Sequence, residues 1–383
     1  MTIPLERTVA SVDLAAIESN IAVMRDVAQG SDLMVVVKAD AYGHGVIPVA
    51  RTARECGTSW LGVALPGEAI ELREAGDTGR ILAWLWAPGD VHIEACVRAN
   101  VDMSVSSLWS LAEVENAARV SGTRARIHLK IDSGLSRNGC VAADWNALVM
   151  EVLAARDRGY VEVEAFWTHL ANADQPGDLE VAVQLAAFEQ AIQIASDFGL
   201  DAPHSHVANS AAAIAYPATR TSIVRTGIAV YGLSPGESAD RVASRLTPAM
   251  TVSARLASVK TIPAGTGVSY GHTWRASNPT TVGLVPVGYA DGIPRAASNR
   301  GRVSVKGSLV PVIGRIAMDQ FVVDLTAVDG AVAPGDDVTI FGSGAAGEWT
   351  ADQWALSADT IGYEIVTRIG ARVPRRYRGV SWE

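Results

Sequence analysis

The sequence predicts two domains, a (β/α)8 barrel over residues 1–240 and a mainly β-sheet domain over residues 241–383. The chain has 383 residues, which is more than one ordinary hydrophobic core accommodates. Short apolar runs alternate with helical periodicity in the first part, whereas strand-like runs follow one another directly in the second. These observations place the barrel domain in the α/β class.

The barrel is predicted from eight apolar runs of strand length: Leu33–Val37, Trp60–Leu65, Ile81–Trp86, Val101–Val105, Ala125–Ile131, Val161–Trp167, Ser205–Ala208 and Ser222–Val224. Helical periodicity lies between them, for example in Gly67–Ala75, Leu108–Val120 and Leu179–Phe198. Eight strands that alternate with helices favour a closed barrel over a doubly wound sheet, which usually has fewer strands.

The second domain is predicted to begin after Gly232–Arg245, a segment rich in Ser, Gly and Asp. Six strand-like runs follow, separated by Gly and Pro turns: Thr251–Lys260, Thr281–Val287, Arg302–Val305, Val310–Ile313, Gln320–Leu325 and Asp337–Phe341. Helical periodicity returns at Ala351–Ile361. At the other end of the chain, we expect Arg7–Val12 to form a strand, so that residues 1–12 join the second domain.

The composition indicates a globular cytoplasmic protein. Hydrophobic residues make up 49% and charged residues 19% of the chain, and the net charge is −9, which argues against nonspecific nucleic-acid binding. The N-terminus lacks a basic segment followed by an apolar one, and every apolar run is too short to span a membrane. The three cysteines, Cys56, Cys96 and Cys140, show no metal-binding spacing.

The segment Val35–Gly45 carries the first chemical signal, because Lys38 ends an all-apolar run. Barrel enzymes place their reactive groups at the carboxyl ends of strands. A partly desolvated lysine there has a lowered pKa and forms a Schiff base with an aldehyde. By position alone, however, a lysine that extends from a strand end into solvent is the better interpretation of Lys38.

Polar motifs also follow other predicted barrel strands, at Lys130–Gly139, Thr168–Asp174, Val207–Ser210 and Val224–Gly232. In the first, a surface ion pair between Asp132 and a basic neighbour is an alternative to a functional role. Asn209 is an ordinary helix N-cap residue, while Ser210 at a helix start also suits a phosphate.

A metal site is a weaker alternative for the histidines of this region. Histidine is a common zinc ligand, so His169, His204 and His206 could in principle form such a site. No carboxylate pattern accompanies these histidines, so we predict no metal.

The second domain holds four further motifs: Gly267–Trp274, Pro286–Arg295, Gly314–Gln320 and Thr360–Ile365. Alone, a Tyr-Gly turn such as that at Tyr270 is usually structural. Single motifs of this kind are weak evidence, whereas their joint occurrence in one order is strong.

Together these segments resemble the alanine racemases. Val35–Gly45 is similar to the family's attachment signature for pyridoxal 5′-phosphate (PLP), and matching segments continue to about Tyr377. Ser133, Leu135 and Ala317 depart from the usual Thr, Met and Cys but keep the hydroxyl or small apolar character. The resemblance implies a cytoplasmic, PLP-dependent homodimer that interconverts L- and D-alanine for cell-wall peptidoglycan.

The resemblance implies that PLP is bound by Lys38, Tyr42, Arg137, His169, Asn209, Ser210, Arg225, Gly227, Ile228 and Tyr363. The counterpart of Lys130 is often carbamylated, which gives an anion that holds the arginine matching Arg137. The counterpart of Arg225 faces the pyridine nitrogen. Since an arginine only donates, that nitrogen stays unprotonated, which makes the ring a weaker electron sink and disfavours transamination.

The catalytic residues implied are Lys38, Tyr270, His169 and Arg225, with Tyr270 reaching the cofactor of the partner subunit. The implied substrate-binding residues are Arg137, Met318, Tyr289 and Asp319, and the residues that line the approach to the site are Asp174, His206, Arg295, Arg315 and Ile361.

Four other functions compete with an alanine racemase. A serine or broad-spectrum racemase would use the same bases. Basic amino-acid decarboxylases carry glycine-cluster loops and a Cys-Glu-Ser-Gly-Asp type segment that the sequence lacks, and non-catalytic PLP carriers lack a second domain. A metal-dependent barrel hydrolase is the remaining alternative.

Overall fold

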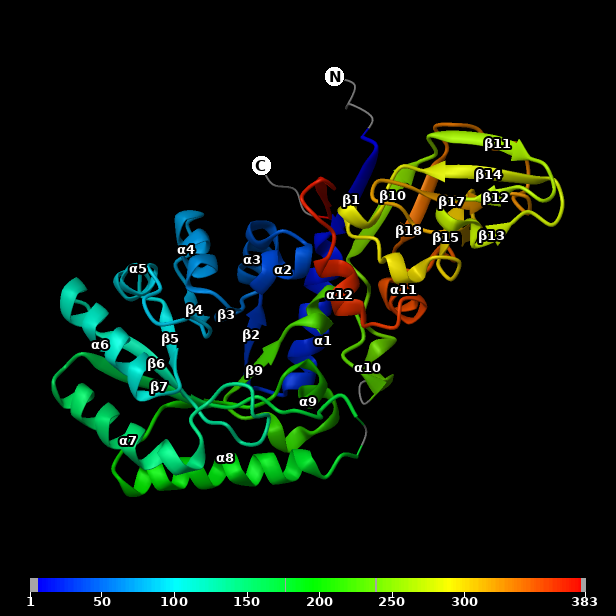
Figure 1. Ribbon diagram of the computed structural model, residues 1–383. Helices are drawn as coiled ribbons and strands as arrows, with labels where there is room; N and C mark the ends of the chain where they lie inside the picture. Colours follow the sequence, from blue (N-terminus) through cyan, green and yellow to red (C-terminus); the bar gives the residue numbers. More distant parts are fainter. Residues whose placement is uncertain (1–5, 176, 238–239, 380–383) are drawn as a thin grey trace.

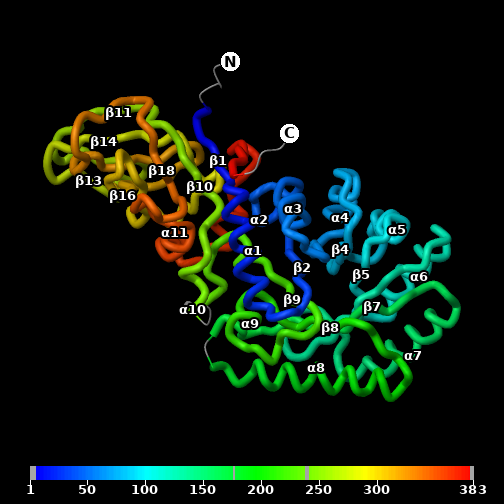
Figure 2. The backbone as a smooth tube through the Cα atoms, turned by 180° about the vertical axis from the view of Figure 1, so that it is seen from behind, coloured from blue at the N-terminus to red at the C-terminus, as the bar shows by residue number. Residues whose placement is uncertain are grey.

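The computed structural model describes residues 6–175, 177–237 and 240–379. The chain forms two lobes, a barrel with its helices and a β-sheet lobe beside it (Figure 1). Seen from behind, β1 (Thr8–Asp13) runs between the two lobes (Figure 2).

The barrel is a parallel eight-stranded sheet in the order β8-β7-β6-β5-β4-β3-β2-β9. All eight predicted runs form its strands, which are β2 (Asp32–Val36), β3 (Trp60–Val63), β4 (Arg80–Ala83), β5 (Asp102–Val105), β6 (Ala125–Lys130), β7 (Val161–Trp167), β8 (His204–His206) and β9 (Ile223–Thr226). The Arg225 N–H donates to the Ala208 carbonyl at 3.0 Å, which brings β9 back to the end of β8. The predicted (β/α)8 barrel is therefore confirmed.

The helices of the barrel lobe lie outside this sheet, and the three predicted ones appear as α4, α6 and α8 (Figure 1). Side-chain oxygens of Asp13 and Ser107 accept backbone N–H groups at the starts of α1 and α6, which fixes where these helices begin. The set is α1 (Leu14–Ala28), α2 (Lys38–Gly43), α3 (Val46–Glu55), α4 (Pro66–Glu74), α5 (Ile93–Arg98), α6 (Leu108–Ser121), α7 (Ala142–Asp157), α8 (Glu180–Asp197) and α9 (Ser210–Ala215), with the 3-10 turns η1 (Pro217–Thr219) and η2 (Ile228–Tyr231).

The second lobe is built on a nine-stranded sheet in the order β11-β14-β17-β16-β15-β18-β10-β1-β19. Its strands besides β1 are β10 (Met250–Arg255), β11 (Ser258–Ile262), β14 (Thr280–Val285), β15 (Arg302–Val305), β16 (Ser308–Ile313), β17 (Phe321–Asp324), β18 (Asp337–Phe341) and β19 (Arg375–Arg378). Short elements complete it: α10 (Asp240–Ala243), β12 (Gly267–Val268), η4 (Tyr270–His272), β13 (Trp274–Arg275), η5 (Tyr289–Asp291), η6 (Arg295–Ala297), α11 (Ala351–Ser357) and α12 (Gly362–Thr367). The mainly β second domain is confirmed.

The opening strand joins the second lobe, as expected. β1 pairs antiparallel with β10 and parallel with β19. The domain limits at residues 240 and 241 stay a prediction. Residues 1–5, 238–239 and 380–383, which belong to the predicted ranges, lie outside the described residues.

Two predictions for the second lobe were wrong in detail. The run Thr251–Lys260 forms two strands rather than one, because Leu256 leaves β10 to exchange backbone hydrogen bonds with Gly335 and Asp336. The helix expected over Ala351–Ile361 ends at Ser357, since Asp359 adopts a positive φ of 55°, and α12 begins only at Gly362. The short β12, β13, β19 and α10 were not predicted.

In the described part of the chain, none of the helices combines the length and the apolar character that a membrane-spanning segment requires.

Candidate active site

A cavity of about 300 Å³ opens at the carboxyl ends of the barrel strands. Every residue that the sequence assigned to the cofactor lines it, and so does Lys130. The lining residues are Val36, Lys38, Tyr42, Trp84, Lys130, Arg137, Trp167, His169, Asn209, Ser210, Arg225, Gly227, Ile228 and Tyr363. The barrel thus gathers into one place residues that lie far apart along the chain.

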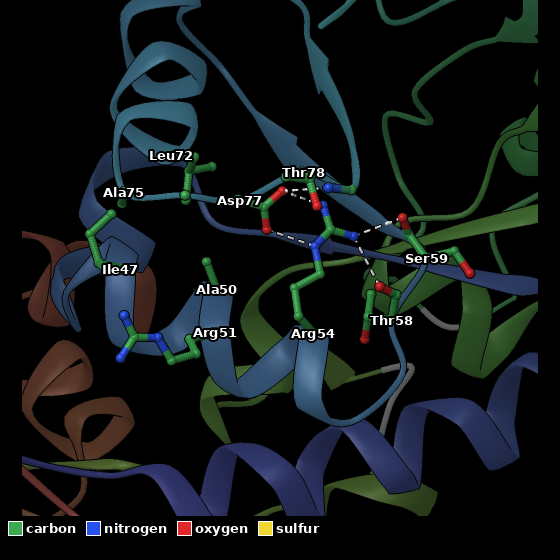
Figure 3. A pocket seen from close by; sticks show the side chains of 12 residues that line it. Ile47, Ala50, Arg51, Arg54, Thr58, Ser59, Leu72, Ala75, Asp77 and Thr78 are labelled. Carbon is green, nitrogen blue, oxygen red and sulfur yellow. Dashed lines mark hydrogen bonds and ion pairs between the residues drawn. The ribbon is translucent and has the colours of Figure 1, made fainter. Parts of the chain in front are cut away.

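A larger hollow of about 480 Å³ lies at the opposite end of the barrel, between α3, α4 and the starts of β3 and β4 (Figure 3). Its central cation, Arg54, already holds an ion pair with Asp77 at 2.8 Å. The same guanidinium donates to the carbonyls of Thr58, Ser59 and Arg80. Arg54 therefore joins the loops at this end of the barrel, whereas barrel enzymes carry their active sites at the other end.

Lys38 follows Val37 just beyond the end of β2, and its Nζ is 5.8 Å from the centre of the Trp84 ring. Burial lowers the pKa of Lys38, and the nearby cations Arg137 and Arg225 lower it further, against the opposing effect of Glu68. A lysine in such surroundings is uncharged more often than one in water, and only the uncharged amine attacks a carbonyl carbon.

The turn after Lys38 is left-handed, which is unusual for residues with side chains. Ala39, Asp40, Ala41 and Tyr42 all have φ between 52° and 54°. Such a conformation costs about 1–2 kcal/mol for each residue that is not glycine. Strain of this size persists only where surrounding contacts impose it, and it is concentrated at functional sites.

Contacts from four sides hold this turn. The Ala39 N–H donates to Glu68 Oε1 at 2.6 Å, and Asp40 Oδ1 accepts from the Val46 N–H at 2.7 Å. His44 lies with its Nδ1 3.0 Å from the Tyr42 carbonyl. From the end of the chain, Arg375 Nε donates to the Gly43 carbonyl at 3.0 Å. The position of Lys38 therefore depends on both ends of the chain.

Arg225 is the buried cation at the floor of the cavity, on β9. Its two terminal nitrogens donate to the carbonyls of Thr168, His206 and Val207 at 2.9–3.0 Å. They also face the Nδ1 atoms of His206 at 3.0 Å and His169 at 3.1 Å. Burial lowers the pKa of Arg225 to about 9, so the guanidinium still carries its proton at neutral pH.

His206 does not lie at the approach to the site, so that prediction was wrong. Its side chain is fully buried inside the barrel, stacked on the Trp167 ring at a centroid distance of 5.3 Å. Burial, with Arg225 beside it, lowers the pKa of His206 well below the usual value, which keeps the ring neutral. Because β8 directs His206 toward the barrel interior, the residue supports Arg225 from below.

Lys130 ends β6 and its Nζ lies 4.3 Å from the centre of the Trp167 ring. Burial lowers the pKa of Lys130 to about 7, and the positive charges of Arg225 and Arg137 act in the same direction. The neighbouring Asp132 accepts the backbone N–H groups of Gly134 and Ser136 and thereby shapes the turn that follows. A neutral amine beside two arginines is the chemical situation that favours carbamylation.

Hydroxyl and amide groups converge at the Tyr42 side of the cavity. Ser210 Oγ accepts the Gly227 N–H at 3.0 Å, and the Tyr42 and Tyr363 rings lie 6.2 Å apart. Asn209 caps α9 by accepting the Ala212 N–H at 2.9 Å. The helix-cap interpretation of Asn209 is therefore confirmed, and the residue also lines the cavity.

Besides Ile361, six predicted residues of the second lobe do not line the cavity: Tyr270, Tyr289, Arg295, Arg315, Met318 and Asp319. Tyr270 is 71% exposed and borders a separate hollow that His272 and Gln320 also line. Asp319 pairs with Arg372 at 2.8 Å. Within one chain, these residues therefore contribute nothing to the wall of the cavity around Lys38.

Two residues expected at the approach, Asp174 and Ile361, line a hollow next to the cavity. This hollow shares Asn209 and Tyr363 with the cavity around Lys38. The two spaces are therefore neighbours, and the role of Asp174 and Ile361 stays a prediction.

Sequence reasoning missed two aromatic residues, Trp84 and Trp167. Both line the cavity, and Trp167 packs against Lys130, Arg225 and His206. Trp84 lies inside the predicted run Ile81–Trp86 and just beyond β4, and Trp167 ends both the predicted run and β7, so their place near strand ends was the available signal. For metals, the described residues contain no group of three or more His, Cys, Asp or Glu placed to hold an ion.

Comparison with known proteins agrees with this geometry. The model of the alanine racemase N-terminal domain matches residues 12–235, and that of the alanine racemase C-terminal domain matches residues 249–377. The alanine racemase of Streptomyces coelicolor is 50% identical over 377 residues, covering 97% of this chain and 96% of the relative. That of Beutenbergia cavernae is 50% identical over 372 residues, with 97% of each chain covered.

Solved structures give the same result. The alanine racemase from D-cycloserine producing Streptomyces lavendulae has a TM-score of 0.96 and 50% identity, with 99% of each chain covered. The alanine racemase from Bartonella henselae with covalently bound pyridoxal phosphate has a TM-score of 0.87 and 25% identity, covering 97% of this chain and all of that one. Because the family models cover most of the chain and the relatives match along its whole length, the chain belongs to the alanine racemase family of enzymes.

Proposed function

We propose that the chain interconverts L- and D-alanine with PLP held at Lys38. The observation that carries the proposal is a lysine of lowered pKa in a cavity that also holds a buried arginine and a cluster of hydroxyl groups. Few other cofactors require an amine, a ring-facing cation and phosphate ligands in the same small space.

The residues of the cavity fit PLP group by group. Lys38 offers the amine for the aldehyde carbon, and Arg225 offers N–H donors for the pyridine nitrogen. Arg137, which also lines the cavity, would donate to the phenolic oxygen, and His169 lies beside Arg225. The phosphate has donors in Tyr42, Ser210 and Tyr363 and in the backbone at Gly227 and Ile228, next to Asn209. When bound, PLP supplies the electron-withdrawing system that acidifies the Cα–H bond of an amino acid.

Racemisation needs one base on each face of the substrate Cα. Lys38 Nζ is the base on one face. The second is the phenol oxygen of Tyr270 from a second copy of the chain, since Tyr270 is exposed and does not line its own cavity. One base removes the proton as the other delivers a proton to the opposite face, and holding both at fixed positions supplies the rate advantage of proximity. The enzyme is thus proposed to act as a homodimer with shared sites.

Arg225 limits the chemistry to this single proton exchange. Its terminal nitrogens are held by three carbonyls and keep their protons at neutral pH. The arginine therefore only donates toward the cavity. A pyridine nitrogen that receives a hydrogen bond but no proton withdraws fewer electrons, which disfavours transamination.

Lys130 is proposed to carry a carbamate. The pKa of Lys130 is about 7, so its neutral amine is abundant at higher pH. This amine adds to carbon dioxide and releases a proton. The resulting anion neutralises the cation cluster and holds the Arg137 guanidinium in place.

The substrate is proposed to be alanine, with serine or a broader range of amino acids as the alternative for the same bases. Arg137 and, from the partner subunit, Met318, Tyr289 and Asp319 would contact it. The residues proposed to line the approach are Asp174, Arg295, Arg315 and Ile361. The product would serve peptidoglycan synthesis in the cytoplasm.

The test is conversion of L-alanine to D-alanine by the purified protein, followed together with its visible absorbance. Lys38→Ala should lose both the cofactor absorbance and nearly all activity. Lys260→Ala, which removes an exposed lysine of β11, should retain both. Full activity of Lys38→Ala would contradict the proposal, and equal rates with L-serine would favour the broad-spectrum alternative.

A further inference from the structure

A row of buried polar side chains crosses the interior of the barrel beneath Arg225. Its members are Arg225 on β9, His206 on β8, His128 on β6 and Asp102 on β5. Barrel interiors are usually filled by branched apolar residues, so four polar side chains in contact are exceptional. All four are buried, and each hydrogen-bonds the next one.

The proton positions along this row follow from its two ends. Arg225 is a donor only, so His206 Nδ1, 3.0 Å away, must be the bare nitrogen. A neutral His206 then carries its proton on Nε2 and donates it to His128 Nδ1 at 2.8 Å. His128 in turn carries its proton on Nε2, which faces Asp102 Oδ2 at 3.4 Å. The Asp102 carboxylate can only accept a hydrogen bond, so it requires the same proton positions on the two imidazoles as the Arg225 donor does.

Neither imidazole has a place for a second proton. Protonating His128 on Nδ1 would set two N–H groups against each other across 2.8 Å, and protonating His206 on Nδ1 would do the same toward Arg225. Burial lowers the pKa of both histidines, that of His206 with the help of Arg225. Both rings therefore stay neutral with one defined tautomer each.

Two arginines near the amino-terminal ends of the neighbouring strands hold the Asp102 carboxylate in place. Arg80 donates to Asp102 Oδ2 at 2.7 Å, and Arg126 donates to Oδ1. Burial opposes ionisation of Asp102, but the hydrogen bond from His128 and the charges of Arg80 and Arg126 outweigh it and lower the pKa. The carboxylate thus stays an acceptor, which is what the tautomer of His128 depends on.

We propose that Asp102 is a positioning residue that, through His128 and His206, sets the hydrogen-bond direction that holds the Arg225 guanidinium at the cavity. The consequence is that a residue at the amino-terminal end of β5 controls a group at the opposite end of the barrel. The inference deepens the proposed function and rests on it only where activity is the readout.

The direct test reads the histidine tautomers of the purified protein by long-range ¹⁵N NMR after ¹⁵N-histidine labelling. For His128 and His206, the proposal expects bare Nδ1 and protonated Nε2. A proton on Nδ1 of either ring would overturn it. The readout needs neither substrate nor activity, so a failed racemase assay would reject the proposed function while this result would still decide the tautomers.

The variant test uses Asp102→Asn, which keeps the shape but leaves one acceptor oxygen for the donors of Arg80, Arg126 and His128. Of these three donors, only the imidazole can move its proton to its other nitrogen, so His128 should change from the Nε2–H to the Nδ1–H tautomer. His206 Nε2 must then accept this proton, and His206 presents Nδ1–H toward Arg225. We expect a changed His206 tautomer and a drop in kcat of about tenfold or more, with little change in KM. An unchanged tautomer with unchanged kcat would overturn the proposal.

Glu164→Gln is the matched control, because Glu164 pairs with the same Arg80 at 2.9 Å but has no hydrogen bond to the histidines. It should leave tautomers and kcat within about twofold of the parent. A loss equal to that of Asp102→Asn would overturn the proposal by pointing to charge alone. In a His128→Leu background, Asp102→Asn should cause no further loss, whereas additive losses would show that Asp102 does not act through His128. If Asp102→Asn fails to fold, the tautomers of the parent protein still decide.

Discussion

A methyl group on Gly227 would lie 2.4 Å from the phenol oxygen of Tyr42. The two residues come from opposite parts of the barrel sequence, after β9 and after β2, and they meet at the cavity. Gly227 has a negative φ of −113°, so it is the approach of Tyr42, and not backbone conformation, that requires a glycine here.

Gly227→Ala should therefore weaken cofactor binding by displacing Tyr42. Overpacking of this kind costs about 1–3 kcal/mol, which corresponds to roughly 5- to 150-fold in affinity. Cofactor titration by absorbance measures the affinity, and thermal unfolding measures the packing. Gly67→Ala is the control, since a Cβ there meets only His92 at 3.7 Å. If the double variant Gly227→Ala, Tyr42→Phe recovers the melting temperature, the loss is due to the contact with the phenol oxygen. A double variant that melts as low as Gly227→Ala would contradict this explanation.

Shared active sites predict complementation between two inactive variants. Lys38→Ala lacks the amine, and Tyr270→Phe lacks the second base. Random exchange of subunits makes half of the dimers mixed, and each mixed dimer has one intact site, so about a quarter of the sites should be active. Activity is measured after mixing and subunit exchange. Sites built within a single chain would give no recovery at all.

A carbamate on Lys130 predicts a dependence on carbon dioxide and pH. Because the pKa of Lys130 is lowered to about 7, the neutral amine that reacts is abundant above that pH and scarce below it. With ¹³C-bicarbonate, the protein should show a carbamate resonance that grows as pH rises through 7 and that Lys130→Arg removes. Lys260→Arg should keep the resonance, and a signal that persists in Lys130→Arg would refute the assignment.

Acid should destabilise the protein through Asp291. Its buried carboxylate accepts Arg7 at 2.7 Å and the Gly288 N–H at 2.9 Å. Burial opposes ionisation, but these bonds and Arg372 outweigh it and lower the pKa of Asp291. Its stabilising effect is thus complete above the unfolded-state pKa, about 4, and is lost as pH falls through the lower folded-state pKa.

Asp291→Asn should therefore lower the free energy of unfolding at neutral pH and flatten its decline in acid. Urea unfolding between pH 7 and 3 measures both. Asp329→Asn, a change at an exposed loop residue, should leave the pH dependence as it is. An unchanged acid slope in Asp291→Asn would show that other carboxylates dominate.

The barrel could be predicted from the sequence because each of its strands is a short apolar run with polar or glycine residues at its end. A parallel strand covered on both faces needs such a run, and the ends carry the reactive side chains. Lys38 and Lys130 were found in this way. Trp84 and Trp167 were not, since an aromatic residue at a strand end looks like part of the apolar run.

Three features could not be predicted because they depend on contacts between residues that lie far apart in the sequence. His206 was assigned to the approach, yet the closure of the barrel turns it inward. The link from His128 to Asp102 joins two strands, and no local pattern in an apolar run indicates which side chain will be its partner. The left-handed turn after Lys38 contains no glycine until Gly43, so residue preferences argue against it and only tertiary contacts explain it.

That turn also determines when during synthesis the site can exist. Arg375 holds the Gly43 carbonyl from 332 residues further along the chain, and Tyr363 forms part of the cavity wall. Domains generally fold as they leave the ribosome, the N-terminal one first. The barrel strands are complete long before Arg375 is translated, so a nascent barrel has its lysine but lacks the contact from Arg375 to the turn that follows it. If the chain binds PLP as proposed, the cofactor would therefore meet a fully held lysine only after the segment with Arg375 has been synthesised and packed.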